Sequence, residues 1–193
     1  MLLESIVSKQ YEAGQLLPKE ESLAEQFDMS RGTVREALRA LEERHVVMVR
    51  HGRGALVRPT AEWNVLDPVV ARVLGAGRRR RDFLREVNAL RQILEPEAAG
   101  LAAQRASEAQ RAELRVRREE LADAIDVDKS AMRIRRLIAD ASGNRPLAGT
   151  LRALDDAVEQ PLQAKDVEAC SRLAEAVAAG DPEAARAAAR ELS

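Results

Sequence analysis

The stretch SRGTVREALRAL, residues 30–41, combines a helix start signal, an apolar face and three evenly spaced arginines. Ser30 suits the N-cap position, because its side-chain oxygen can accept a hydrogen bond from a backbone N–H in the first turn of a helix. The apolar residues recur at helical spacing and are Val34, Ala37, Leu38 and Leu41. Arg31, Arg35 and Arg39 lie together on one flank, clear of this face. The stretch therefore predicts an amphipathic helix with a cationic flank.

A tight turn and a short helix are expected immediately upstream of this stretch. Pro18 fits the first position of the short helix, and Glu20 and Glu21 follow it, where acidic side chains favour a helix N-terminus. Another helix is expected over residues 2–10, and Gly14 lies beyond its end as a helix breaker. These signals make the arginine-flanked helix the third helix of the chain.

The pattern downstream of the third helix changes to that of a β-hairpin. Residues 46–57, VVMVRHGRGALV, are rich in β-branched residues and are interrupted by a basic, glycine-containing tip. Two helices, a tight turn, a third helix and a hairpin follow one another in the order of a winged helix-turn-helix. In that fold a helix enters the major groove of duplex DNA, and the hairpin tip can contact phosphates or the minor groove.

An ordinary solvated helix face is the alternative explanation for the three arginines. The surrounding charge decides against it, because seven arginines and only three glutamates lie between Ser30 and Arg58. The scarcity of aromatic side chains argues against stacking on single-stranded bases. Double-stranded operator DNA is therefore the expected partner of this region.

Composition limits the class of protein. The 193 residues are 46% hydrophobic and 33% charged, which is typical of a globular chain. Only 2% are aromatic, so the core must consist of aliphatic residues that favour helices. No stretch approaches the apolar length of a membrane span, and the single Cys170 suits a reducing cytosol, so we expect a cytoplasmic protein with no membrane partner. With a net charge of −1, nucleic acid would be bound through a local patch.

The remainder of the chain predicts helices. We expect a mainly α protein, with an N-terminal winged helix-turn-helix that carries a small β-hairpin wing, followed by an all-α helical bundle. The expected boundaries are residues 1–59 for the DNA-binding domain, 60–80 for a linker with a short helix, and 81–193 for the bundle. Pro96 is expected to kink or restart a helix. Helices in the second half of the bundle are expected near residues 128–141, 146–164 and 166–179.

The quoted patterns resemble the GntR family of bacterial transcription regulators. The pattern LLPKEESLAEQFDMSRGTVREALRALEE followed by VRHGRGALV resembles that family's DNA-binding domain. The bundle resembles its FCD-type effector domain through residues 90–103, 138–147 and 175–188. The resemblance implies DNA contacts from Arg31, Thr33 and Arg35 on the recognition helix and from His51 and Gly52 on the wing. Together with the residue pattern, it makes the candidate DNA-contacting residues Ser30, Arg31, Thr33, Arg35, Arg39, His51, Gly52 and Arg53.

Two positions in the DNA-binding half depart from the family pattern. Glu21 stands where some relatives carry a basic residue early in the second helix. His45 stands where a turn glycine is usual, so we expect either a positive φ at His45 or a different turn. These departures bear on affinity and sequence preference.

The bundle departs further from the family it resembles. FCD domains commonly hold a divalent metal through one Asp and several His, and the metal helps to bind a carboxylate ligand. The corresponding positions here are Ala131, Arg135, Cys170 and Leu192. Both histidines of the chain lie in its DNA-binding half. We therefore expect no structural metal and no cofactor, and Cys170 to be a small buried hydrophobe.

The effector implied by the resemblance is a small carboxylate. Residues 61–74 resemble the segment after the wing in regulators of galactonate and related sugar-acid operons. Arg91 corresponds to a pocket arginine of the family and could pair with a carboxylate, although an exposed or interhelical arginine is an equal alternative. Arg135 could replace the charge of the missing cation. Arg91 and Arg135 are therefore the candidate ligand-binding residues.

The sequence is compatible with three functions. The first is a dimeric, ligand-responsive DNA-binding regulator of a metabolic operon, usually a repressor. The second is a regulator or interaction module that has lost ligand sensing and binds DNA constitutively. An enzyme is the weakest, because no nucleophile–base pair, phosphate loop or metal cluster stands out and no catalytic residue is expected.

Overall fold

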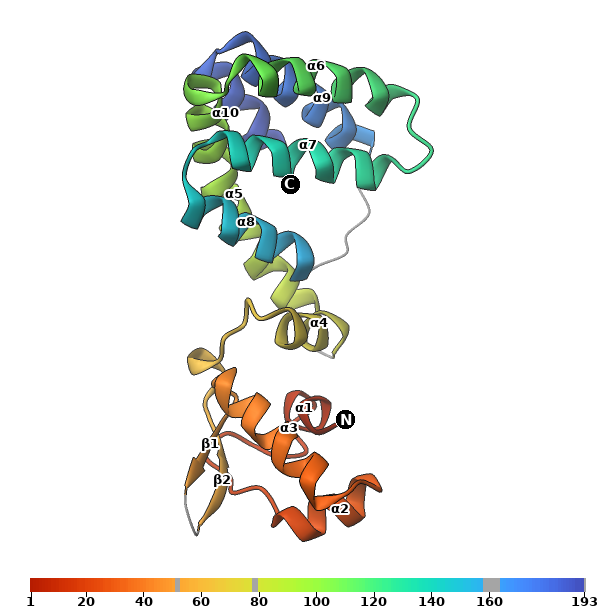
Figure 1. Cartoon of the computed structure of the whole chain (residues 1–193), viewed down its shortest axis with the longest axis vertical. Helices are drawn as coiled ribbons and strands as arrows, with labels where there is room; N and C mark the ends of the chain where they lie inside the picture. Colours follow the sequence, from red (N-terminus) through yellow and green to blue (C-terminus); the bar gives the residue numbers. More distant parts are fainter. Residues whose placement is uncertain (51–52, 78–79, 158–163, 193) are drawn as a thin grey trace. The chain divides into compact units, whose positions relative to one another are not determined.

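The computed structural model describes residues 1–50, 53–77, 80–157 and 164–192. The chain divides into two compact units, Met1–Phe83 and Leu84–Ser193, and the boundary falls within helix α5 (Figure 1). Within the described residues, helices predominate and the two strands form one antiparallel hairpin, so the expected fold class is confirmed.

The first unit has the element order of a winged helix-turn-helix. Its elements are α1 (Leu2–Val7), α2 (Glu20–Phe27), α3 (Arg31–Glu43), β1 (Val47–Arg50), β2 (Gly54–Val57), the 3-10 helix η1 (Thr60–Glu62) and α4 (Pro68–Ala76). The hairpin register pairs Val47 with Val57 and Arg50 with Gly54. Figure 1 shows α2 and α3 joined by a short turn, with the hairpin following α3.

The start of α3 has the predicted cap. The Ser30 Oγ accepts a hydrogen bond from the Thr33 N–H at 3.1 Å, which satisfies one of the backbone donors that a helix N-terminus leaves free. The apolar face is buried at Val34, Leu38 and Leu41. Both the helix and its orientation therefore follow from the sequence pattern.

The expected positive φ at His45 is confirmed. His45 has a φ of 60° in the turn between α3 and β1, in the left-handed region that glycine adopts most easily. Its backbone N–H donates to the Glu42 carbonyl at 2.9 Å, and the Val46 N–H donates to the Leu41 carbonyl at 2.9 Å. The turn that usually contains glycine is therefore formed with histidine in its place.

Two helix boundaries upstream differ from the sequence prediction. Helix α1 ends at Val7, because Lys9 adopts a left-handed φ of 64°. Helix α2 begins at Glu20, so Pro18 does not occupy its first position. The reason is a long-range contact: the Leu17 N–H donates to the Ala55 carbonyl of β2 at 2.8 Å, which keeps the chain before α2 extended.

The second unit is a helical bundle. Its helices are α5 (Arg80–Arg105), α6 (Glu108–Ala122), α7 (Val127–Ala141), α8 (Arg145–Ala157), α9 (Ala164–Ala179) and α10 (Pro182–Glu191). The capping box at Ser107 and the pairing of the Asp181 cap with Pro182 are both formed. Of the two outcomes expected at Pro96, a kink or a restart, the restart does not occur, because helix α5 continues through Pro96. The described part of helix α8 runs to Ala157, and residues 158–163, over which the helix is predicted to continue to 164, lie outside the described residues.

The core of the bundle lies among α5, α6, α7, α9 and α10. Its largest fully buried side chains are Leu114, Leu121, Ile134, Val177 and Cys170. Alanines make up much of the rest of the core, and their small side chains allow the helices to approach one another closely. Helix α8 packs on α7, and its own buried residues lie outside this core cluster among the described residues. None of the described helices is both long enough and apolar enough to cross a bilayer.

Candidate functional site

The exposed N-terminal end of α3 presents several polar groups. The Ser30 and Thr33 hydroxyls lie 2.9 Å apart, and both side chains are exposed. Backbone N–H groups and the positive end of the helix dipole are also directed outward at a helix N-terminus, which favours anions there. Ser30, Thr33 and the first turn of α3 therefore form a surface that suits a phosphate or the edge of a base.

The three arginines on the flank of α3 each pair with an acidic side chain. Arg31 lies 2.6 Å from Glu21, Arg35 lies 3.2 Å from Glu20, and Arg39 lies 2.8 Å from Glu36. The arginine side chains are 56–65% exposed. Exposed pairs of this kind contribute about 0–1 kcal/mol each. The guanidinium groups can therefore exchange these carboxylates for another anion at little cost.

The pairing of α2 with α3 was missed by the sequence reasoning. The sequence pattern indicates that Glu20 and Glu21 favour a helix N-terminus and that Glu21 replaces a basic residue of some relatives, but it does not indicate a partner for either. In the structure they lie beside the first two arginines of α3, across the turn that joins the two helices. The unusual acidic residue at position 21 was visible in the sequence, but its partner depends on the crossing of α2 and α3.

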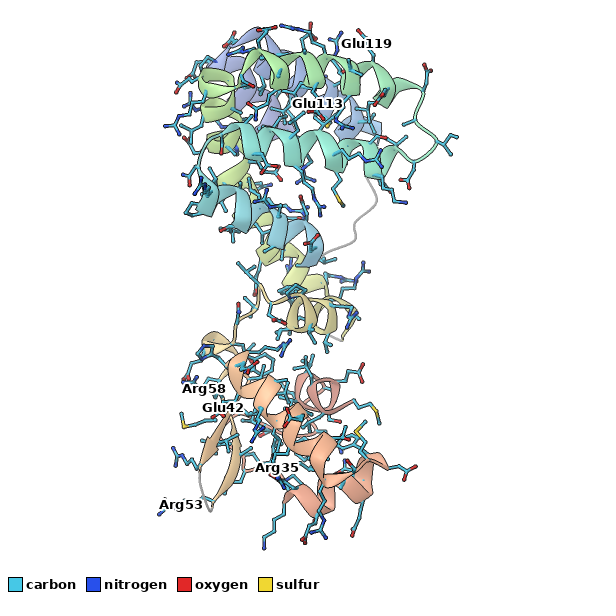
Figure 2. All side chains as sticks on the ribbon, in the orientation of Figure 1. Arg35, Glu42, Arg53, Arg58, Glu113 and Glu119 are labelled. Atoms are coloured by element: carbon cyan, nitrogen blue, oxygen red, sulfur yellow. The ribbon has the colours of Figure 1, made fainter. Side chains whose placement is uncertain are left out.

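The hairpin tip carries further positive charge. Arg50 and Arg53 are exposed, and neither pairs with a carboxylate among the described residues. Figure 2 shows Arg53 at the tip of the hairpin, extending away from it, and Arg35 on α3 in the same unit. The predicted wing residues His51 and Gly52 lie outside the described residues.

A buried charge cluster occupies the second unit, and it contains both candidate ligand-binding arginines. Arg91 and Glu95 are one turn apart on α5, Arg135 comes from α7, and Asp155 comes from the last turn of α8. Arg91 lies 2.8 Å from Asp155 Oδ1, and Arg135 forms a hydrogen-bonded ion pair with Glu95. Arg135 also lies 3.8 Å from the same Asp155 oxygen. The structure therefore brings both arginines together as interhelical residues.

Burial and mutual charge perturb this cluster. Burial, followed by the nearby Arg135, lowers the pKa of Arg91, and Asp155 opposes that shift. Burial raises the pKa of Glu95, against the effect of Arg135. For Arg135, burial acts to lower the pKa, but Glu95 and Asp155 together raise it. The half-exposed Arg136 also lies 3.9 Å from the other Asp155 oxygen, but it has its own close partner in Asp156. The guanidinium groups of Arg91 and Arg135 balance the two carboxylates in charge, which is how buried charges are usually tolerated.

The space beside this cluster is small. A pocket of about 20 Å³ is lined by Glu95, Ala98, Arg135, Ile138, Ala139, Leu151, Asp155 and Leu173. A buried water needs roughly 10–15 Å³, so this pocket has room for about one water molecule. A sugar acid does not fit in it without movement of a helix or of a side chain.

The four residues at the family's metal positions do not suit a metal. Ala131 and Cys170 lie side by side, with the Cys170 Sγ 3.9 Å from the Ala131 carbonyl oxygen, and Leu192 belongs to the same core cluster. Burial raises the pKa of Cys170 to about 12, so its thiol stays protonated and is a poor ligand. The Arg135 guanidinium would repel a cation. Among the described residues, no three His, Cys, Asp or Glu side chains gather closely enough to hold an ion.

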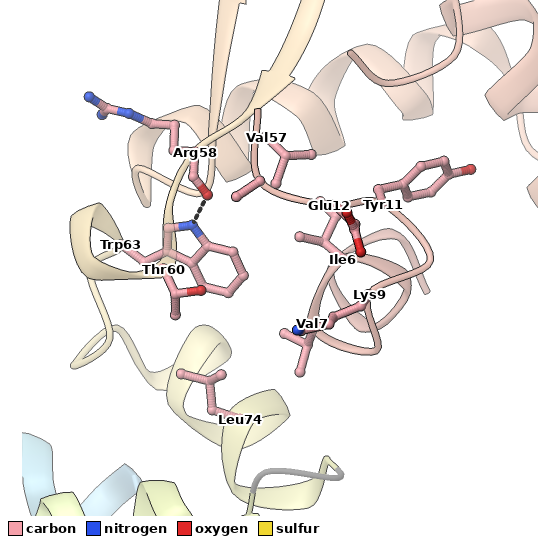
Figure 3. Close-up of a pocket in the computed structure, with 11 residues that line it drawn as sticks. Ile6, Val7, Lys9, Tyr11, Glu12, Val57, Arg58, Thr60, Trp63 and Leu74 are labelled. Carbon is pink, nitrogen blue, oxygen red and sulfur yellow. Dashed lines mark hydrogen bonds between the residues drawn. The ribbon is translucent and has the colours of Figure 1, made fainter. Parts of the chain in front are cut away.

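A larger cavity lies in the first unit, away from every predicted site residue. It has a volume of about 330 Å³ and is bounded by α1, the chain that follows it, the end of β2, η1 and α4. Figure 3 shows Trp63, Tyr11 and Lys9 among the residues around it. The Trp63 indole N–H donates to the Arg58 carbonyl at 2.9 Å, so the polar atom of this buried ring is already satisfied.

Comparison with protein families identifies both halves of the chain. Residues 1–57 match the model of bacterial regulatory proteins of the gntR family, and residues 86–192 match the FCD domain. The galactonate operon transcriptional repressor of Escherichia coli (strain K12) is 32% identical over 111 residues, which cover 58% of this chain and 48% of the relative. The putative L-lactate dehydrogenase operon regulatory protein of the same organism is 29% identical over 200 residues, covering 94% and 76%. The chain thus spans about half the length of the galactonate repressor.

Solved structures show the same architecture. Streptococcus agalactiae GntR has a TM-score of 0.56 at 26% sequence identity and aligns over 99% of this chain and 92% of its own. E. coli McbR/YncC has a TM-score of 0.51 at 23% identity, covering 99% of this chain and 89% of its own, which shows a common fold alone. These likenesses agree with the family matches, and the relatives are transcription regulators, not enzymes. The chain belongs to the bacterial gntR family of transcription regulators, in the group that carries an FCD domain.

Proposed function

We propose that this gntR-family regulator binds duplex operator DNA through α3 and the hairpin, and represses a metabolic operon in response to a small carboxylate. The observation that carries the DNA-binding part is the exposed set of arginines on α3, together with Arg53 at the tip of the hairpin. A helix fits the major groove, and arginine can read guanine through two parallel hydrogen bonds. The first unit would bind DNA, and the second would bind the effector and form the dimer.

Different roles are assigned to the α3 residues and to the wing. Arg31 and Arg35 lie in the first two turns of α3, where side chains of a recognition helix reach base edges. Ser30 and Thr33 would contact the DNA backbone at the helix N-terminus. Arg39 lies farther along the same flank, and Arg53 at the hairpin tip would contact phosphate. His51 and Gly52 complete the proposed wing contact.

Arg53→Ala is expected to weaken binding to operator and to unrelated DNA by a similar factor. A phosphate contact carries no sequence information, and its loss releases fewer counterions on binding. The slope of log K against log salt should therefore become shallower by about one. Fluorescence anisotropy titrations at several salt concentrations measure both effects.

The matched control for Arg53→Ala is Arg72→Ala, which removes an exposed arginine on α4 outside the proposed interface. Its salt slope should equal that of the unmodified chain. An Arg53→Ala slope that matches the control would contradict the phosphate contact.

A homodimer is expected, with its main contacts in the helical half or at its junction with the DNA-binding half. A two-fold dimer presents two recognition helices to repeated half-sites, so the operator should be a palindrome. The bundle exposes the large apolar side chains of Ile93, Val116 and Ile125, which a dimer contact would cover. Light scattering of the full chain at micromolar concentration should give twice the mass of 21.2 kDa. A monomeric mass would refute this.

A sugar acid such as galactonate is the proposed effector. Support comes from the galactonate operon repressor among the relatives and from the two buried arginines in the effector half. Selection of bound duplexes from a random pool, repeated with galactonate, tests the whole proposal. Recovery of a palindrome whose binding galactonate weakens supports it. The absence of any enriched sequence would overturn DNA recognition.

A constitutive regulator is the second candidate, and a specific observation favours it. The effector-site arginines are already neutralised by Glu95 and Asp155, and only about 20 Å³ of space remains beside them. A chain that has lost sensing would select the same palindrome with and without galactonate.

A further inference from the structure

One oxygen of Asp155 lies between two buried guanidinium groups. The Asp155 Oδ1 is 2.8 Å from Arg91 and 3.8 Å from Arg135, and the side chain is only 7% exposed. Arginine is well suited to bind a ligand carboxylate, and here two guanidinium groups approach one carboxylate oxygen. Here the carboxylate belongs to the chain itself.

The two cations do not depend equally on Asp155. Arg135 has its own ion pair with Glu95, which does not involve Asp155. Arg91 has Asp155 as its close acid partner and also donates to the Leu154 carbonyl at 3.1 Å. The Arg91 Nε is buried and has no hydrogen-bond partner among the described residues. The Nε–H of Arg91 is therefore free to donate a hydrogen bond to a carboxylate in a different orientation.

Asp155 lies on α8, whose described residues, unlike those of α5 and α7, are absent from the core cluster of the bundle. It lies two residues before Ala157, the last described residue of α8, and this helix packs on α7. Arg91, Glu95 and Arg135 lie on α5 and α7, both of which contribute to that core. A shift of the last turn of α8 would remove Asp155 while leaving the two arginines in place.

We propose that Arg91 and Arg135 form a carboxylate-binding site whose occupant in this structure is the chain's own Asp155, and that an effector carboxylate binds by displacing Asp155. This inference rests on the proposed carboxylate-responsive function. One monoanion replaces another, so the charge of the buried cluster does not change. Glu95 stays with Arg135 and keeps the site from attracting a second anion.

The first experiment is chemical rescue of Asp155→Ala by acetate in the full chain. Removing the carboxylate leaves a space of about its size next to Arg91, and acetate can fill that space. Asp155→Ala should melt below the unmodified chain in sodium chloride. Replacing chloride with acetate at equal ionic strength should raise its melting temperature by roughly 3–6 °C, as expected when acetate exceeds its Kd about tenfold.

Three variants make this result specific. Asp156→Ala removes the neighbouring acid, which is 53% exposed, and should show no more acetate effect than the unmodified chain. Adding Arg91→Gln to Asp155→Ala should abolish the rescue, because the principal cation is lost. Asp155→Asn keeps the side-chain shape but carries no negative charge, so acetate should displace it from the arginines more readily than it displaces Asp155 and should also stabilise this variant. Absence of an acetate-specific response in both Asp155 variants would overturn the site, even if Asp155→Ala itself is poorly folded.

The second experiment tests displacement with galactonate. The galactonate concentration needed to stabilise Asp155→Asn should be at least tenfold lower than the concentration needed for the unmodified chain. In the variant, galactonate no longer competes with the Asp155 carboxylate. Acetate rescue without any galactonate effect on either chain would overturn displacement by this class of effector.

DNA titrations of the same proteins separate this inference from the proposed function. Operator binding without an acetate response in the Asp155 variants refutes the carboxylate site and leaves the regulator intact. An acetate response in a chain that binds no DNA supports the site and refutes the proposed function.

Discussion

Replacing Arg135 with alanine is expected to lower the free energy of unfolding by about 3–5 kcal/mol. Arg135 is the partner of the buried Glu95 and also lies near the buried Asp155. Its removal leaves two buried carboxylates with Arg91 as the only remaining guanidinium of the four-residue cluster. Losing one member of a buried ion pair is costly because its partner remains desolvated without compensation. Urea unfolding followed by circular dichroism measures the loss.

The matched control for Arg135→Ala is Arg152→Ala. Arg152 is 42% exposed and pairs with the half-exposed Asp140, so its loss should cost less than about 1 kcal/mol. Equal stability of the two variants would show that the buried cluster contributes no more than a surface pair.

The stability deficit of Arg135→Ala should also depend on pH. Burial already raises the pKa of Glu95, and Arg135 opposes that rise, so removing Arg135 raises it further. Between the raised pKa and the ordinary value of about 4.3, Glu95 is protonated in the folded variant but ionised in the unfolded chain. The free energy of unfolding of the variant therefore rises as the pH falls through this range. The deficit relative to the unmodified chain should therefore be smaller at about pH 5 than at pH 8. A deficit that widens as the pH falls would contradict this.

Arg35→Ala is expected to weaken operator binding by about 1–3 kcal/mol, or about 5- to 150-fold, because a guanidinium that reads a base is lost. The side chain is 56% exposed and its contact with Glu20 is a surface pair, so helix content should not change. Mobility-shift titration of the selected operator measures the loss, and discrimination should relax at one base position.

The control for Arg35→Ala is Arg117→Ala in the second unit, which removes an arginine paired with Glu113 on α6. This variant should bind the operator like the unmodified chain. If Arg35→Ala bound the operator as tightly as the control does, Arg35 would not be part of the DNA interface.

Local signals were sufficient to predict most of the DNA-binding half. The Ser30 cap, the Val34 face and the β-branched stretch after His45 each act within a few residues, and all three are formed. Pro18 was misplaced because the strand-like pairing of Leu17 with β2 connects residues that are distant in sequence. Propensity rules contain no information on that contact.

The effector half shows the same limit more strongly. Arg91 and Arg135 could be nominated through the family resemblance, and the Arg91–Glu95 spacing on one helix was visible in the sequence. Asp155 could not be nominated, because it reaches the cluster from α8, 64 residues beyond Arg91. The size of the remaining pocket depends on side-chain packing among four helices. Neither property is encoded by local periodicity.

The carboxylates of Glu20 and Glu21 beside the recognition arginines have a consequence for the search along a genome. On a random sequence, Arg31 and Arg35 would exchange one anion for another, while both glutamates stay close to the negatively charged backbone. Such encounters gain little attraction and dissociate quickly. At a matching site, hydrogen bonds from the arginines to base edges compensate for the repulsion between the two glutamates and the phosphates. We therefore expect short residence times on unrelated DNA, so that each molecule tests many positions between productive encounters.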